Sequence, residues 1–79
     1  MIRLSEIKKA ENKIYCAAYF EDSPQPVSLT YDIDERVFLP FDFPAGYEWC
    51  KTHAAHAARH LEELATAPVI PTEKTIMWY

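Results

Sequence analysis

Apolar residues recur with two different periods along this chain, and this change of period constrains the fold more than any other feature. In the first half they alternate with polar residues, most cleanly over residues 27–33. The inward members of that run are Val27, Leu29, Tyr31 and Ile33. From about residue 45 to 66 they recur every three or four positions. Alternation is typical of a half-buried strand and the longer period of an amphipathic helix, so we predict a sheet followed by one helix.

Three strands and a short fourth are predicted in the first half, over residues 2–9, 13–20, 27–33 and 37–39. The second has apolar side chains on both faces, so we expect it in the centre of the sheet. The turn before it contains Asn12, which tolerates the left-handed backbone of a tight turn. The prolines at 24 and 26 mark a loop, and Pro40 ends the fourth strand.

The helix is predicted over about residues 45–66, which are rich in alanine. Asp42 is a candidate cap, and Pro68 ends the helix. Its apolar stripe comprises Tyr47, Cys50, Ala54, Ala57, Leu61, Leu64 and Ala65. The apolar C-terminal tail should either add an edge strand or dock on a surface. The predicted fold is α+β over residues 1–79 as one domain: a small antiparallel sheet of three to four strands packed against one long helix, with a terminal strand as an option.

The charge distribution argues against direct nucleic-acid binding. The chain has 12 acidic and 8 basic residues and a net charge of -4, whereas proteins that bind nucleic acids neutralise phosphates with a basic surface. The acidity is concentrated between residues 21 and 42, where Arg36 is the single base. These carboxylates are either solvated strand-face charges or a partner-binding set, namely Glu21, Asp22, Asp32, Asp34, Glu35 and Asp42.

All three histidines fall on the predicted helix, at steps of three and four, so that His53, His56 and His60 share one face. A pair of histidines at this spacing can bind zinc or nickel, but the glutamate of a metalloprotease motif is missing. We interpret the row as amphipathic side chains at the edge of the core, with their polar tips in water. A weak metal site and a pH-sensitive interface are the alternatives, and no cofactor is expected.

The two cysteines, Cys16 and Cys50, are too few for a disulfide scaffold and are predicted to be reduced core residues. The chain carries a charged side chain by its third residue, and it has no apolar signal core and no apolar run of the length that a membrane span needs, so we expect a cytoplasmic protein. Cys50 precedes His53 by three residues, but a thiol on the core side of a helix would not be activated. We therefore expect no catalysis.

Eleven aromatic residues are many for 79, and one small core has little room for all of them. Tryptophan and tyrosine dominate the energetics of protein interfaces. Candidate interface residues are Trp49, Trp78 and Tyr79, together with the acidic set. An interface between two copies, through the helix or the terminal strand, is an alternative use of this surface.

In its small size, its acidity and its lack of catalytic motifs, the chain resembles small phage-encoded inhibitors such as anti-CRISPR and anti-restriction proteins. The resemblance implies a non-catalytic protein–protein interaction module that occupies a basic, nucleic-acid-binding surface of a larger protein. It rests on composition and transfers no site. A structural homo-oligomer or accessory subunit, and a metal-binding or pH-responsive module using the helix histidines, are the other functions considered.

Overall fold

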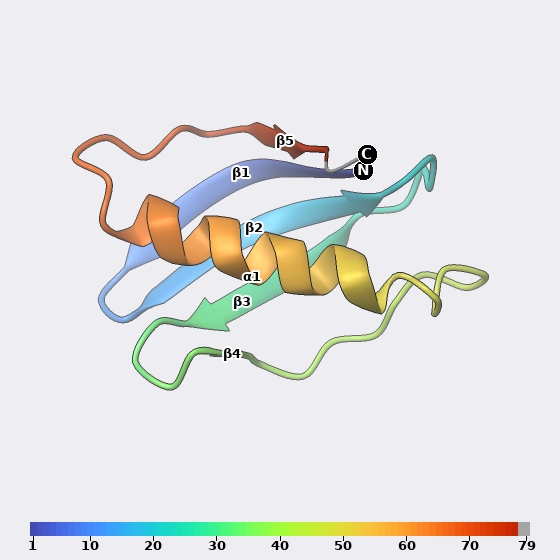
Figure 1. The fold of residues 1–79 in the computed structure, drawn as a ribbon, viewed down its shortest axis with the longest axis horizontal. Coiled ribbons are helices and arrows are strands. Elements are labelled where there is room, and N and C mark those ends of the chain that lie inside the picture. Colours follow the sequence, from blue (N-terminus) through green and yellow to red (C-terminus); the bar gives the residue numbers. More distant parts are fainter. Residues whose placement is uncertain (78–79) are drawn as a thin grey trace.

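The computed structural model describes residues 1–77, which form one antiparallel sheet and one helix. The elements are β1 (Ile2–Ala10), β2 (Lys13–Phe20), β3 (Val27–Asp32), β4 (Val37–Phe38), α1 (Lys51–Ala65) and β5 (Lys74–Ile76). The strand order is β4-β3-β2-β1-β5, and α1 crosses one face of the sheet (Figure 1). The predicted α+β fold is confirmed, and the tail adds an edge strand, β5, beside β1.

The core lies between α1 and the inward face of the sheet. The alternation in β3 is confirmed, because Leu29 and Tyr31 are buried while Ser28 is exposed. The central position of β2 is also confirmed. The largest fully buried side chains are Tyr31, Phe20, Ile2, Leu4, Ile14, Leu29, Leu61 and Cys50. Ala57 on α1 is fully buried as well, so a small side chain lets the helix approach the sheet.

The helix begins later than its composition predicts. It starts at Lys51 rather than near residue 45, and Cys50 takes the N-cap position without a side-chain hydrogen bond, so Asp42 is not the cap. The only glycine, Gly46, has φ of 85° and interrupts any earlier helical turn. Tight turns replace it, with the Tyr47 amide donating to Pro44 and the Cys50 amide to Tyr47. The helix ends at Ala65, close to the predicted position.

Two backbone features of the first hairpin were not predicted. The register passes from Ser5 opposite Ala17 to Lys8 opposite Tyr15, so β1 contains a β-bulge. Glu6 in this bulge has φ of 51°. In the following turn the left-handed residue is Glu11, with φ of 55°, and not Asn12.

Candidate functional site

The acidic segment does not form one patch, because the fold divides it between the two ends of the sheet. Glu21 and Asp22 follow the end of β2, whereas Asp32 is the last residue of β3 and Asp34 and Glu35 follow it. These strands are antiparallel, so the two groups are separated by the length of β3, about 20 Å. In Figure 1 the turn after β3 lies at the left and the loop after β2 at the right.

The carboxylates after β3 are used locally. Asp32 accepts a hydrogen bond from the Glu35 amide at 3.0 Å, and its other oxygen lies 3.8 Å from the Lys13 ammonium. Asp34 accepts from the Asn12 side-chain amide at 3.1 Å, which ties the β3–β4 turn to the β1–β2 turn. Asp32 and Asp34 therefore shape two neighbouring turns, while the Glu35 side chain is exposed.

At the other end, residues from two distant segments meet in what we call the acid–aromatic corner: Glu21, Asp22, Tyr47, Trp49 and His53. The Tyr47 hydroxyl donates to Asp22 Oδ1 at 2.6 Å. His53 Nε2 lies 2.6 Å from Glu21 Oε1. These contacts join the loop after β2 to the turns that precede α1 and to the first turn of α1 itself. Of the predicted partner-binding residues, Glu21, Asp22 and Trp49 are thus brought together.

Trp49 is the most exposed aromatic side chain of residues 1–77, at 62% of its surface, and yet its ring is held on several sides. Its indole N–H donates to the Gly46 carbonyl at 2.9 Å. The ring stacks beside Tyr47, with centroids 6.3 Å apart. It also meets His53 edge-on at 5.3 Å. An exposed aromatic side chain with few conformations to lose is a favourable binding element.

His53 corrects the interpretation of the histidine row, because its side chain is 6% exposed and does not reach into water. The loop after β2 folds over it, and Glu21 meets its ring nitrogen. The same Glu21 oxygen also lies 2.7 Å from the Met1 ammonium. His56 and His60 are half-buried. Among residues 1–77 no group of three His, Cys, Asp or Glu side chains is arranged to hold a metal ion.

Local contacts shift the pKa of several groups near the helix. The hydrogen bond to Asp22 raises the pKa of Tyr47. Burial, together with the Lys74 ammonium, lowers the pKa of His60. The two cysteines are free and buried, as predicted. Burial raises the pKa of Cys16 to about 12, and it also raises the pKa of Cys50. Both thiols are therefore protonated at neutral pH, which disfavours nucleophilic attack.

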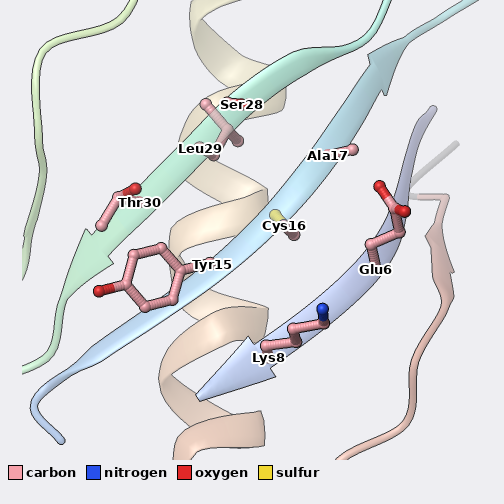
Figure 2. Close-up of a pocket in the computed structure, with 8 residues that line it drawn as sticks. All are labelled: Glu6, Lys8, Tyr15, Cys16, Ala17, Ser28, Leu29 and Thr30. Atoms are coloured by element: carbon pink, nitrogen blue, oxygen red, sulfur yellow. The ribbon is translucent and has the colours of Figure 1, made fainter. Parts of the chain in front are cut away.

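The sheet face opposite α1 forms a second surface, which the sequence did not reveal. A shallow hollow of about 350 Å³ lies there beside the β-bulge. Figure 2 shows Glu6 and Lys8 on β1, with Tyr15 extending from β2 toward β3. The Arg3 guanidinium lies over the Tyr19 ring, 4.5 Å from its centroid, and both residues line a separate hollow. Because both signs of charge are present, this face lacks the acidic character that the charge distribution predicts for a partner site.

The remaining predicted residues lie apart from the corner or outside the described range. Asp42 is exposed in the segment between β4 and α1. Its neighbours Phe41 and Phe43 pack edge-to-face with centroids 5.1 Å apart. Phe43 also contacts the core residue Phe20, so these phenylalanines belong to the rim of the core. Trp78 and Tyr79 lie outside the described residues.

Comparison with protein-family models, with curated proteins and with solved structures finds no match to this chain. Within residues 1–77, α1 is too short and too polar to cross a lipid bilayer. Neither finding assigns an activity.

Proposed function

We propose that this chain is a non-catalytic protein–protein interaction module that binds a basic surface of a larger protein. In the form that its composition favours, it is a small acidic inhibitor of the anti-CRISPR or another phage anti-defence type, which covers a nucleic-acid-binding surface. It would act in the cytoplasm, where its two free cysteines stay reduced.

The observation that carries this proposal is the acid–aromatic corner. Trp49 offers a large, exposed and conformationally restricted ring, and such rings are common energetic centres of interfaces. The carboxylates of Glu21 and Asp22 contact the two rings next to it, His53 and Tyr47. The Met1 ammonium pairs with Glu21, so Asp22 leaves the corner with a negative charge. Acidic groups at an interface speed encounter with a basic partner and select for it. The same small region thus supplies both affinity and charge selectivity.

In the first step of the test, the tagged full chain is used to capture partners from an extract of the native host, and these partners are identified by mass spectrometry. Binding of each purified partner is then measured by calorimetry for the wild type, for Trp49→Ala and for Asp22→Asn. We expect a partner with a basic surface, about tenfold weaker binding by Trp49→Ala, and affinity that falls as salt is raised.

A double variant at the other end of the sheet, Asp34→Asn with Glu35→Gln, serves as the matched control and should bind like the wild type. The proposal is wrong if Trp49→Ala and Asp22→Asn both keep full affinity for every captured partner. It is equally wrong if the control variant alone loses binding, because the interface would then lie at the β3–β4 turn.

A further inference from the structure

We infer that the acid–aromatic corner recognises an arginine side chain, whose guanidinium would stack on Trp49 while donating hydrogen bonds to Asp22. This inference rests on the proposed function and names the chemical group that the partner presents. Two features of the corner support it, an aromatic platform and an available carboxylate, and the fold contains one internal contact of the same chemical kind, between Arg3 and Tyr19.

The aromatic platform is suited to a cation. Tryptophan is the strongest acceptor of cation–π contacts among the aromatic residues. The Trp49 ring is largely exposed, and Tyr47 extends the aromatic surface from Trp49 toward Asp22 because it contacts both. Because Tyr47 stacks against Trp49 and donates to Asp22, a flat cation on the exposed part of the Trp49 ring would lie near the Asp22 carboxylate.

Asp22 is the carboxylate with capacity for a further donor. Glu21 Oε1 already faces both the Met1 ammonium and His53 Nε2. The Asp22 side chain is exposed, and one of its oxygens accepts a hydrogen bond from the Tyr47 hydroxyl. A carboxylate offers about four lone-pair sites, so Asp22 retains several for an incoming N–H group.

Arginine fits this arrangement better than lysine. Its planar guanidinium can stack on a ring while its edge donates to a carboxylate, whereas an ammonium is a compact point charge. The protein already makes one such stack internally, where the Arg3 guanidinium covers Tyr19 at 4.5 Å. That ring is occupied by its own arginine, whereas Trp49 presents 62% of its surface to solvent.

The test uses the isolated full chain and three capped tripeptides, Gly-Arg-Gly, Gly-Lys-Gly and Gly-citrulline-Gly, each titrated to about 50 mM. The readout is the indole N–H signal of Trp49 in ¹⁵N NMR spectra, assigned by its loss in Trp49→Phe. We expect a saturable shift with the arginine peptide at millimolar affinity, about threefold weaker binding of the lysine peptide, and no saturable shift with citrulline.

Asp22→Asn should weaken the arginine peptide about fivefold, while Tyr15→Ala on the opposite sheet face is the matched control and should bind like the wild type. The inference fails if the Trp49 signal does not saturate with the arginine peptide, if citrulline produces the same shift, or if Asp22→Asn binds as tightly. Such a failure is distinct from that of the proposed function, because Trp49→Ala would still weaken a captured partner if the corner binds it through other contacts.

Discussion

At the scale of single residues, the backbone carries strain that glycine would relieve. Within residues 1–77, four residues other than glycine have a left-handed φ, namely Glu6, Glu11, Glu21 and Arg36. A side chain in this conformation costs about 1–2 kcal/mol. Two of these positions serve other roles, because Glu6 borders the hollow on the open sheet face and Glu21 lies in the acid–aromatic corner. Glu11, in an exposed turn, offers the cleanest measurement.

We expect Glu11→Gly to raise the free energy of unfolding by about 1 kcal/mol relative to Glu11→Ala. Both substitutions remove the same charge, but only glycine adopts φ of 55° without steric cost. Urea denaturation followed by circular dichroism measures the difference. Equal stability of the two variants would show that the turn stores no such strain. The sequence pointed to Asn12 for this conformation, because residue preference does not decide which of two turn positions takes it.

His60 should make the protein sensitive to mild acid. Its Nδ1 atom is buried and has no hydrogen-bond partner among residues 1–77. The charged or titratable groups that act on it are Lys74, Glu63, His56 and Arg59. Burial and Lys74 hold its pKa below the ordinary value of 6.5, so the unfolded chain binds a proton more readily than the folded protein. The stability that this group contributes is present above pH 6.5 and is lost as the pH falls through the folded pKa.

The comparison that tests this sensitivity is between the wild type and His60→Gln, by urea denaturation at pH 7 and pH 5. The wild type should lose more stability over this interval than the variant, which has no titrating group at position 60. Thr52→Ala, at an exposed position of the same helix, provides the matched control. If His60→Gln shows the same pH dependence as the wild type, His60 does not contribute to the acid limb.

At the scale of elements, the packing of α1 on the sheet should dominate stability. Leu61 is a residue of α1 whose side chain is fully buried, so Leu61→Ala removes apolar contacts and leaves a cavity. We expect the free energy of unfolding to fall by about 2–5 kcal/mol. Thr52→Ala, at an exposed position of the same helix, should change it by less than about 0.5 kcal/mol. Thermal and urea unfolding measure the stabilities of both variants. Equal stabilities would show that the packing of α1 on the sheet does not dominate the stability of the fold.

The elements themselves were largely predictable, and the exceptions have local causes. The bounds of β2 and β3 lie within a residue of the expected ones, because alternation directly reflects which side chains meet the core. The predicted start of α1 is too early. The alanine-rich composition favours a helix throughout residues 45–66, whereas the left-handed backbone of Gly46 interrupts it. The bulge at Glu6 adds one residue to β1 and leaves no distinctive pattern in a strand with few apolar positions.

At the scale of the whole molecule, the antiparallel topology decides which charged residues become neighbours. Residues 21–42 look like one acidic segment along the chain, but β3 runs back across the sheet between its two acidic groups. The same topology returns the chain after β4 to the far end, where Tyr47 reaches Asp22 across 25 positions in sequence. A candidate site could therefore be assembled only in part from the sequence. Its acidic and aromatic members were predicted individually, and Tyr47 and the buried His53 were missing from the partner-binding set.

Buried hydroxyl and thiol groups should set an alkaline limit on the stability of the fold. Burial raises the pKa of Cys16 to about 12. The pKa of Tyr31 is also raised to about 12, mainly by burial and secondly by the hydrogen bond that its hydroxyl donates to Glu62. This hydrogen bond joins the sheet to the helix. The ordinary values are 9.0 for the thiol and 10.0 for the phenol. The unfolded chain therefore releases these protons first, and stability falls as the pH rises from about 9 through 12.

Together with the acid limb from His60, this alkaline limb places maximal stability between about pH 6.5 and 9. Thermal unfolding by circular dichroism from pH 8 to 11 should show a continuous fall in midpoint for the wild type. The fall should be shallower in Tyr31→Phe and in Cys16→Ala, even though each variant begins from a lower stability at pH 8 because it loses a buried hydrogen bond or core volume. Tyr15→Phe, at an exposed position, is the matched control and should follow the wild type. A slope unchanged in both core variants would show that these two groups do not govern the alkaline limit.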